Sequence, residues 1–359
     1  MSSLIVEVCK VEAVEKHPNA DRLDIIQVKG WNCIVGRDQY KVNNLVVFVP
    51  PDSIIPEDLI NKYQLEYLRN GGKVGTTKLR GCLSQGLILD VPEGNWKVGD
   101  NVAETLKIVK WEPPTASYQV AKTTSKKKLN PDFDKYTDIE NIKNYNYIFQ
   151  PEDYVVITEK IHGANARYAN LPIYIDKRCS LFTKLKLWFK KRCGKTHEFI
   201  YGSHNVQITN NSNQNSFYGN DVWGKIADKY DLANIIPKDY IIYGEVYGKG
   251  IQDLTYDLDD IDLVIFDIKY KDKYLPWYEV HNFCKKNCLP LVPELYVGSW
   301  KNVDLDEFTN GKSKLAPNQI REGCVVKMYD ESNDTRIGRK ILKSVSPDYL
   351  MRKGGTEYK

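Results

Sequence analysis

The sequence of 359 residues has no long apolar stretch, and its N-terminus has no apolar core. A membrane-spanning helix needs roughly 20 consecutive apolar residues, and no run in the chain approaches that length. A secretory signal peptide needs a shorter apolar segment, which the opening residues MSSLIVEVCK lack. We therefore expect a soluble, intracellular protein without a membrane partner, located in either the cytoplasm or the nucleus.

Cysteine and net charge are also too low to define a class of protein. Eight cysteines in a chain of this length do not make a disulfide scaffold. His281, Cys284 and Cys288 have helical spacing, which favours the inner face of an amphipathic helix, so we expect no structural zinc site there. The formal net charge of +4 permits a nucleic-acid partner but does not indicate one.

The first third of the chain contains short apolar segments separated by turn-forming residues. The segments are LIVEV, LDIIQV, NCIVG, NLVVFVP and GLILDVP. Short strands at this spacing predict a small β-barrel over residues 1–112. Residues 113–136 contain prolines, small polar residues and a run of lysines, which is typical of a linker.

Residues 137–359 mix strand and helix patterns. The strand candidates are YVVIT, YIIYGEVYG, DLVIFDI, GCVVKMY and RKILKSV, and the helix candidates are DVWGKIADKYDL and YEVHNFCKKN. Thr137 and Glu140 have the spacing of a capping box, which predicts a short helix at that point. The mixture predicts an α+β domain, and the polar residues at its strand ends favour a site between sheets.

The stretch TEKIHGANAR places Lys160 at the end of a predicted strand, with Gly163 close by. A lysine in such a place is most often a solvated surface charge. To act as a nucleophile its amine must be neutral, which requires desolvation or neighbouring cations. The chemistry also needs carboxylates for a hydrated metal ion and cations for phosphate. Four later segments supply these residue types, namely YGEVYG, VIFD, EGCVVK and RKILK.

As an ordered set, these segments resemble the motifs of the covalent nucleotidyltransferases, which include ATP-dependent RNA and DNA ligases and mRNA capping enzymes. KIHG is similar to motif I, YGEVYG to motif III, VIFD to motif IIIa, EGCVVK to motif IV and RKILK to motif V. DNA ligases and capping enzymes usually carry aspartate at the third position of motif I, whereas KIHGAN resembles the KxHGxN form of RNA ligase 2-type enzymes. The resemblance implies an α+β, ATP-grasp-like ligase domain with antiparallel sheets over residues 137–359.

The resemblance also implies the reaction. Lys160 would be the catalytic nucleophile that attacks the α-phosphorus of ATP and forms lysyl-AMP. The AMP would pass to an RNA 5′-phosphate, and a 3′-OH would then displace it. Mg²⁺ or Mn²⁺ is the implied metal cofactor, with Glu245 and Glu322 as its candidate ligands.

A larger set of residues is implied to bind ATP. The set is Glu159, Ile161, Asn165, Glu245, Phe266, Glu322, Lys327, Lys340 and Lys343. Phe266 would stack on adenine, although core packing is the alternative for a strand phenylalanine. Lys340 and Lys343 would face opposite ways in a regular strand, so we favour Lys343 as the inward-facing one.

The N-terminal segment resembles a second family. HPNADRL at residues 17–23, with VVFVPPDSIIP and LRGCLSQGLIL downstream, is similar to the OB-fold tRNA-binding module appended to some aminoacyl-tRNA synthetases. An OB fold ahead of a nucleotidyltransferase resembles the domain order of one RNA ligase family. Only 16 residues follow Lys343, so we expect no C-terminal OB domain of the kind that DNA ligases and capping enzymes carry.

Two further features are candidates for contact with RNA. Related ligases often carry an arginine in the strand after motif I, where this chain has YGSHNVQI and His204. Residues 176–196 combine many basic residues with helical apolar spacing, which fits an RNA-gripping insert, a membrane-surface or partner helix, or a helix packed on the core with a solvated basic face. The RNA-binding candidates in it are Lys184, Lys186, Lys190, Lys191 and Arg192.

The sequence therefore predicts a monomeric, ATP-dependent RNA ligase that repairs RNA with 3′-OH and 5′-phosphate ends, with no protein partner evident. A DNA or nick-sealing ligase of the same superfamily is one alternative, which the KxHG form disfavours. A non-catalytic tRNA-binding protein is the other, and HPNADRL is its best support. The sequence leaves open whether nicked duplexes, single strands or broken tRNA loops are the substrate.

Overall fold

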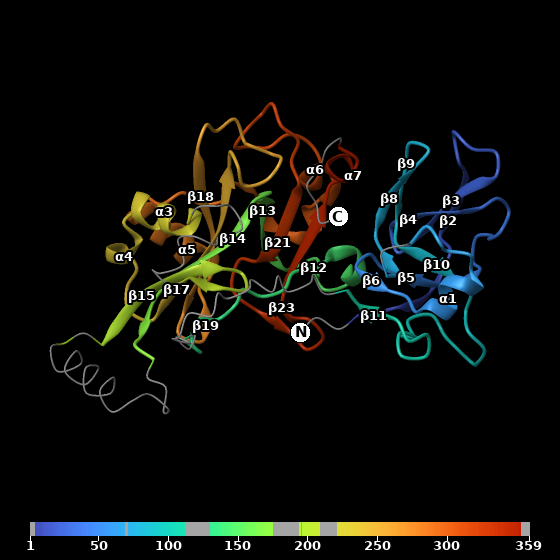
Figure 1. Cartoon of the computed structure of the whole chain (residues 1–359), viewed down its shortest axis with the longest axis horizontal. Helices are drawn as coiled ribbons and strands as arrows, with labels where there is room; N and C mark the ends of the chain where they lie inside the picture. Colours follow the sequence, from blue (N-terminus) through green and yellow to red (C-terminus); the bar gives the residue numbers. More distant parts are fainter. Residues whose placement is uncertain are drawn as a thin grey trace. The chain divides into compact units, whose positions relative to one another are not determined.

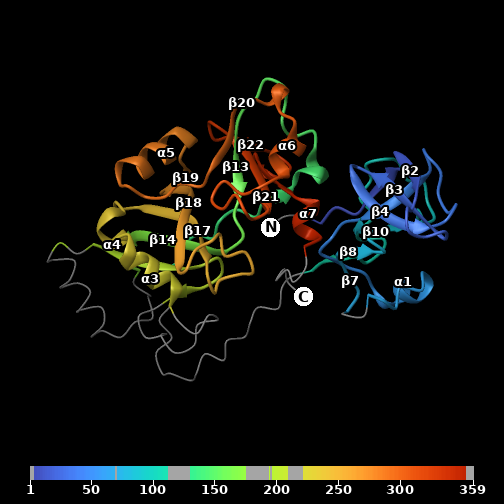
Figure 2. The same cartoon turned by 90° about the horizontal axis from the view of Figure 1, so that it is seen from above.

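The chain forms two compact units in a computed structural model that describes residues 4–68, 71–111, 130–174, 194, 196–208 and 221–352. The first unit is Met1–Ser117 with Ile142–Asn146, and the second is Tyr118–Asn141 with Tyr147–Lys359. Figure 1 and Figure 2 show their elements. None of the helices in the described ranges is both long and apolar enough to cross a membrane.

The first unit consists mainly of short antiparallel strands. Its sheets are β1 (Glu7–Lys10), β5 (Leu45–Val49) and β10 (Leu87–Leu89); β2 (Ala13–Lys16), β3 (Leu23–Val28) and β4 (Trp31–Gly36); β6 (Ser53–Ile54), β7 (Lys73–Val74) and β11 (Val109–Lys110); and β8 (Thr76–Leu79) with β9 (Cys82–Gln85). A short helix, α1 (Glu57–Lys62), lies between β6 and β7. The predicted N-terminal strand segments are confirmed, since each of them overlaps one of these strands.

The central strand β5 explains why this unit has two cores. Side chains alternate between the two faces of a strand. Val47 and Val49 belong to one buried cluster, whereas Val46 and Phe48 belong to another. The continuous apolar run NLVVFVP is thus used on both faces, as expected for a strand that is covered on both sides.

The second unit is built on two sheets. One has the strand order β16 (Gln207–Ile208), β15 (His197–Ser203), β14 (Ala164–Pro172), β17 (Tyr240–Gly248), β18 (Ile261–Tyr270) and β19 (Lys273–Tyr274). The other has the order β12 (Glu140–Asn141), β24 (Ile341–Val345), β21 (Gly323–Met328), β13 (Tyr154–Lys160) and β20 (Glu294–Ser299). Neighbouring strands are antiparallel, except for the parallel pair β12 and β24.

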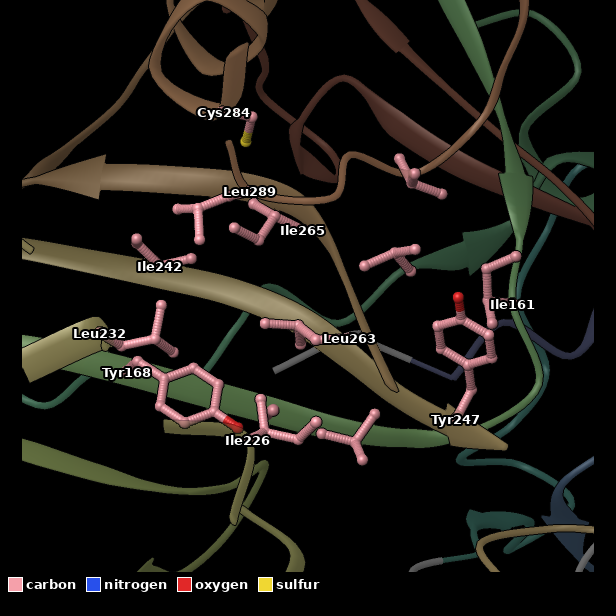
Figure 3. Close-up of a cluster of buried hydrophobic side chains, with 14 of the residues drawn as sticks. Ile161, Tyr168, Ile226, Leu232, Ile242, Tyr247, Leu263, Ile265, Cys284 and Leu289 are labelled. Carbon is pink, nitrogen blue, oxygen red and sulfur yellow. The ribbon is translucent and has the colours of Figure 1, made fainter. Parts of the chain in front are cut away.

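Helices cover one face of the larger sheet. Helices α3 (Val222–Lys229), α4 (Leu232–Ile235) and α5 (Trp277–Lys286) lie beside β14, β17 and β18 in both views (Figures 1 and 2). Their apolar side chains join the strands in one cluster, in which Ile226 and Leu232 accompany Tyr168 and Ile242 (Figure 3). The helix predicted at DVWGKIADKYDL is thus observed as α3, and Asp221 caps it by accepting a hydrogen bond from the Gly224 N–H.

The opposite face of this sheet packs on the five-stranded sheet. Ile241 and Tyr243 of β17, which alternate with Ile242, share a buried cluster with Ile341 of β24, and Val325 of β21 packs against it. The remaining short elements of this unit are β22 (Asn333–Asp334), β23 (Gly338–Arg339), η2 (Trp300–Asn302), α6 (Leu305–Thr309) and α7 (Pro347–Leu350).

Two sequence expectations about local structure are wrong. Thr137 does not cap an α-helix, because Glu140 and Asn141 instead pair with β24, and only a 3₁₀ turn, η1 (Ile142–Tyr145), follows. The cysteine group around α5 does not share one inner face either. Cys284 is buried, but Cys288 lies beyond the helix end and is exposed.

Candidate active site

A cavity of about 230 Å³ lies between the two sheets of the second unit. Strands from both sheets reach it, because β13, β21 and β24 of one sheet and β14, β17 and β18 of the other contribute side chains. Its walls are formed by Tyr136, Thr137, Asp138, Ile139, Thr158, Glu159, Lys160, Ile161, Asn165, His204, Glu245, Val264, Phe266, Val292, Val325, Lys327, Ile341 and Lys343.

Lys160 is the last residue of β13, opposite Gly323 of β21. Its Nζ lies 2.5 Å from Oε1 of Glu322, the residue that precedes β21. The Glu322 side chain is almost fully buried, whereas about a quarter of the Lys160 side chain, 28%, is exposed. This ion pair favours the ammonium form of Lys160 in the structure as it stands.

The chain passes from β13 of the five-stranded sheet to β14 of the six-stranded sheet through only Ile161, His162 and Gly163. Ile161 is buried and packs in the main core (Figure 3). A side chain at Gly163 would place its Cβ 2.3 Å from the Val246 carbonyl oxygen, so this position admits only glycine. The glycine of KIHG is therefore required by the close approach of β17.

Glu245 is the carboxyl group that β17 supplies, at the position paired with Asn165 of β14. Burial raises the pKa of Glu245 to about 8, although the nearby Lys160 ammonium acts in the opposite direction. Glu245 and Glu322 thus differ: Glu245 is largely protonated near neutral pH, and Glu322 forms an ion pair with the lysine.

Three buried oxygens of the site have no hydrogen-bond partner among the described residues: Oε1 of Glu159, Oδ1 of Asn165 and Oε2 of Glu322. The second oxygen of Glu159 accepts a 2.8 Å hydrogen bond from the Lys314 N–H. Burial raises the pKa of Glu159. Because leaving a buried polar atom without a partner is costly, this arrangement favours a polar ligand in the cavity.

The aromatic wall of the cavity comes from β18 and from the segment before β12. The Phe266 ring lines the cavity and meets the Tyr136 ring edge-on at 4.8 Å between centroids. Lys327 lines the same cavity, but its Nζ is directed to the Phe266 carbonyl oxygen at 3.2 Å and to Asp267 at 3.3 Å. Burial lowers the pKa of Lys327, while Asp267 opposes this shift.

The two lysines of RKILK lie in different places. Lys343 lines the cavity together with Ile341, two residues before it on the same face of β24. Lys340 precedes the strand and pairs with Asp153 at 2.5 Å, outside the cavity lining. The alternation of a strand thus brings Lys343, but not Lys340, to the site.

His204 also lines the cavity, 4.0 Å from Asp138, and burial lowers its pKa. The five basic candidates in residues 176–196 lie outside the described residues. The sequence pattern did not predict residues 136–139 as part of the site, because they lie at the edge of a predicted linker and their one motif, the capping box at Thr137, indicated a helix start. The aromatic Tyr136 was their strongest available signal, and it is buried against Phe266.

The comparisons with known proteins fit this geometry. The family model described as RNA ligase matches residues 153–345, more than half of the chain, and an OB-fold domain model matches residues 5–91. The OB-fold prediction for the N-terminal segment is thereby confirmed. A search of curated proteins found no match.

Solved structures of an RNA ligase from Naegleria gruberi have a similar fold. The structure with pyrophosphate is 23% identical with a TM-score of 0.68, covering 97% of this chain and 98% of that one. A lysine-to-alanine mutant with ATP and Mn is 22% identical with a TM-score of 0.68, covering 96% and 98%. A glutamate-to-alanine mutant with AMP and Mn is 22% identical with a TM-score of 0.69, covering 97% and 98%. The match of the family model over residues 153–345 shows that the chain belongs to the RNA ligase family.

Proposed function

We propose that this enzyme is an ATP-dependent ligase that joins RNA 3′-OH and 5′-phosphate ends, with Lys160 as the nucleophile. The observation that carries the proposal is the cavity itself. It holds a lysine at a strand end, the carboxyl groups of Glu159 and Glu245, a further cation at Lys343 and an aromatic ring at Phe266, and Glu322 pairs with the lysine from outside the cavity lining. Structures of a similar fold were solved with ATP, AMP and pyrophosphate, which is what such a reaction uses and releases.

In the first step, neutral Lys160 Nζ attacks the α-phosphorus of ATP. A P–N bond forms, the bond to pyrophosphate breaks, and the amine loses a proton. The Lys160 ammonium that pairs with Glu322 must lose a proton before this attack, because a protonated amine has no free electron pair. Lys343 is positioned to neutralise phosphate charge, which favours both substrate binding and the neutral amine.

In the second step, an oxygen of the RNA 5′-phosphate attacks the same phosphorus, and Lys160 leaves and recovers a proton. In the third step, the RNA 3′-OH attacks the activated 5′-phosphate, loses its proton and releases AMP. Phe266 and Glu159 would hold the adenine by stacking and by an edge contact, and Asn165 would contact the ribose or a phosphate.

The donor set also fits a divalent metal ion. Glu245 and Glu322 both lie close enough to Lys160 to interact with its charge, and one oxygen of Glu322 has no partner among the described residues. A bound cation would favour the ionised form of Glu245, which is largely protonated without it. The described part of the chain contains no group of three or more histidine, cysteine or acidic side chains suited to a metal. Mg²⁺ or Mn²⁺ would therefore be held with water and substrate phosphates, and it would supply charge neutralisation.

Labelling with radioactive ATP tests the first step. The wild-type protein, incubated with α-labelled ATP and Mg²⁺ or Mn²⁺, should retain label after denaturation, and Lys160→Ala should retain none. Lys225→Ala, which removes an exposed lysine of α3 paired with Asp260, is the matched control and should label like the wild type. Label that survives Lys160→Ala would exclude this lysine as the nucleophile.

The acceptor is tested separately. Supplying 5′-phosphorylated RNA to the labelled enzyme should move AMP to the RNA and then yield a joined product, with DNA ends joined more slowly. Better joining of nicked DNA would favour the DNA-ligase alternative. Label from GTP in place of ATP would favour a capping-type activity. A wild-type protein that binds tRNA and takes up no label would support the non-catalytic alternative.

A further inference from the structure

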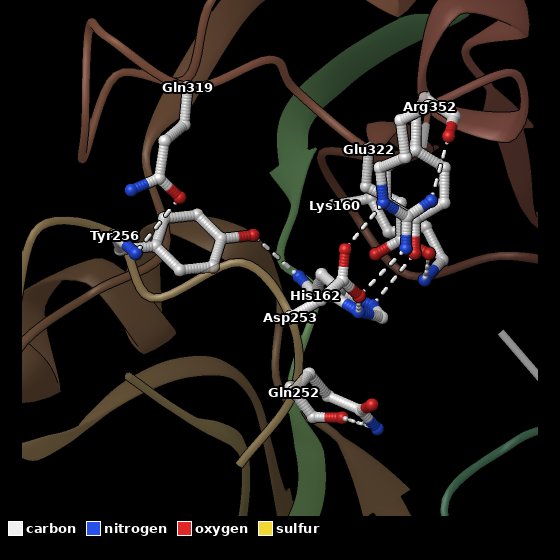
Figure 4. Close-up of polar contacts among 10 residues, drawn as sticks. Lys160, His162, Gln252, Asp253, Tyr256, Gln319, Glu322 and Arg352 are labelled. Atoms are coloured by element: carbon white, nitrogen blue, oxygen red, sulfur yellow. Dashed lines mark hydrogen bonds and ion pairs between the residues drawn. The ribbon is translucent and has the colours of Figure 1, made fainter. Parts of the chain in front are cut away.

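The loop that directly follows the candidate nucleophile is held by a polar network outside the cavity lining. The His162 N–H donates to the Tyr256 hydroxyl at 2.7 Å, and the Gln252 amide donates to the Gly163 carbonyl at 3.4 Å. Figure 4 shows Tyr256, Gln252 and Asp253 grouped around His162, next to Lys160. The segment between β17 and β18 therefore forms hydrogen bonds with the backbone of the loop that joins the two sheets.

The His162 ring is held on both of its nitrogens. Nε2 lies 2.8 Å from Oδ1 of Asp253, and Nδ1 lies 2.7 Å from the Tyr349 hydroxyl. A carboxylate can only accept, so Nε2 carries the proton. In the neutral ring, Nδ1 then accepts from Tyr349. His162 and Tyr349 are both buried, so these contacts are shielded from water.

Arg352 completes the network from beyond helix α7. It donates two hydrogen bonds to the Asp253 carboxylate, at 2.7 Å from Nε and 2.9 Å from Nη2. It also donates to the Tyr349 carbonyl at 2.7 Å and lies 3.6 Å over the Tyr349 ring. A bidentate pair of this kind fixes orientation more strongly than a single contact.

The network reaches the ion pair at Lys160 by a second route. Ser346, just before α7, donates its N–H to the Glu322 carbonyl at 2.9 Å. The same short segment thus contacts the residue that pairs with Lys160 and the histidine two positions after it. We propose that Arg352, Asp253 and Tyr349 form a C-terminal latch that holds the His162 ring and thereby positions Lys160 for attack.

The three latch residues are positioning residues, because none of them lines the cavity. The inference rests on the proposed function of Lys160 as the nucleophile. A displacement of a reacting atom by about 1 Å can cost on the order of 100-fold in rate. Loosening the latch should therefore slow the transfer of AMP to Lys160 more than it weakens ATP binding.

The first test compares Arg352→Ala with Arg336→Ala. Arg336 forms an exposed pair with Asp334 in the same unit, so its loss controls for removing an Arg–Asp pair. We expect Arg352→Ala to lower the labelling rate at saturating ATP about 10- to 100-fold, with the ATP concentration for half-maximal rate changed by less than about 3-fold. Arg336→Ala should behave like the wild type.

Tyr349→Phe is the milder second variant, because it removes one hydroxyl from a fully buried ring of the same shape. It tests the latch on its own if Arg352→Ala fails to fold. We expect it to slow labelling in the same way, with the half-saturating ATP concentration unchanged.

The pH profile provides a readout that general destabilisation would not reproduce. The groups that face His162 are Glu322, Asp253, Arg352, Tyr256 and Tyr349. Burial lowers the pKa of His162, and the positive charge of Arg352 lowers it further. The carboxylates of Glu322 and Asp253 act in the opposite direction. Removing Arg352 should therefore move the titration of the His162 ring, followed by ¹⁵N NMR, to higher pH.

The outcomes separate the latch from the proposed function. If wild-type protein takes up no label, the proposed function fails. If wild-type protein labels, and Arg352→Ala and Tyr349→Phe label at its rate with unchanged His162 titration, the latch is wrong and the proposed function stands. Slow labelling by both variants, with the titration of Arg352→Ala shifted upward, supports the latch.

Discussion

Two glutamates lie near the amine of Lys160, and their surroundings give them different roles. Glu322 forms the ion pair, whereas burial raises the pKa of Glu245 to about 8. A largely neutral Glu245 avoids placing two adjacent negative charges beside a single cation. The site can therefore remain folded before substrate phosphates and a metal ion change the local charge.

The raised pKa of Glu245 predicts how stability depends on pH. Between pH 4.5 and about 8, the folded protein holds a proton that the unfolded chain releases. Wild-type stability should therefore fall as pH rises through this window, by up to about 1 kcal/mol per pH unit. Glu245→Gln removes this dependence. In denaturant unfolding, the free energy of unfolding of the variant relative to that of the wild type should therefore increase as pH rises. The exposed Glu307→Gln should instead track the wild type at every pH, and equal behaviour of both variants would contradict the assignment.

A second buried acid, Asp267, contacts two residues that line the cavity, Lys327 and Tyr136. It contacts Arg339 at 2.9 Å, Lys327 at 3.3 Å and the Tyr136 hydroxyl at 2.7 Å. Burial alone would raise the pKa of Asp267, but Arg339 and Lys327 lower it below the ordinary value. The stabilisation is thus present above about pH 4 and is lost as pH falls through the lowered pKa.

Asp267→Asn should destabilise the protein by about 3–5 kcal/mol, because two cations would remain buried without their carboxylate. Chemical denaturation at neutral pH measures the change. Asp334→Asn, which breaks the exposed pair with Arg336, should cost no more than about 1 kcal/mol. A loss of under about 1 kcal/mol for Asp267→Asn would mean that solvent or a rearranged partner compensates.

At the residue scale, the sequence predicted about half of the residues that line the cavity, and two predicted residues, Glu322 and Lys340, lie outside that lining. Glu159, Lys160, Asn165, Phe266 and Lys343 are all brought together, because strand ends of two sheets converge there. The sequence left both Lys340 and Lys343 as candidates, since the start of β24 decides which lysine faces inward. The latch around His162 joins residues far apart in the chain, so no local pattern could indicate it.

Among the elements, strands were predicted best. YVVIT, YIIYGEVYG, DLVIFDI and GCVVKMY fall on β13, β17, β18 and β21, because these buried strands consist of apolar runs. The capping-box expectation at Thr137 failed because residues 140–141 gain ladder hydrogen bonds from β24. Tertiary pairing overrode a local helix signal, and sequence alone gave no sign of that partner.

The end of helix α5 offers a stabilising change. Cys288 has φ +53° and is exposed just past the helix, where glycine is the favoured residue. Because a non-glycine residue in this region costs about 1–2 kcal/mol, Cys288→Gly should stabilise the protein by roughly 1 kcal/mol and raise its thermal midpoint. Lys285→Gly, inside the same helix, should instead destabilise by about 1 kcal/mol. Equal effects of the two substitutions would show that the backbone at residue 288 is not the determinant.

On the scale of the whole molecule, residues Ile142–Asn146 interrupt the second unit and belong to the first. Trp31 anchors them: its Nε1–H donates to Asn144 at 3.2 Å, and the Lys143 amine lies 5.0 Å from its ring. Trp31 is also buried against Phe48. The sequence prediction assigned these residues to the C-terminal domain, because it assumed that each domain is one continuous stretch of the chain.

Trp31→Ala should therefore destabilise the first unit by about 3–5 kcal/mol. Hydrogen exchange should accelerate in β3, β4 and residues 142–146, while β14 and β17 keep their protection. Trp300→Ala, which removes a ring packed on Phe149 of the second unit, should leave exchange at residues 142–146 unchanged. Slow exchange of 142–146 in Trp31→Ala would contradict this attachment.

The interrupted path of the chain has an evolutionary consequence. The boundary between the units is crossed three times, near residues 117, 141 and 146. A single recombination breakpoint near residue 117 would separate Trp31 from Asn144. An N-terminal unit exchanged in this way would lack residues 142–146, which belong to it. Residues 142–146 should then co-vary with β3 and β4 across descendants of this gene, and module exchange should require two breakpoints rather than one.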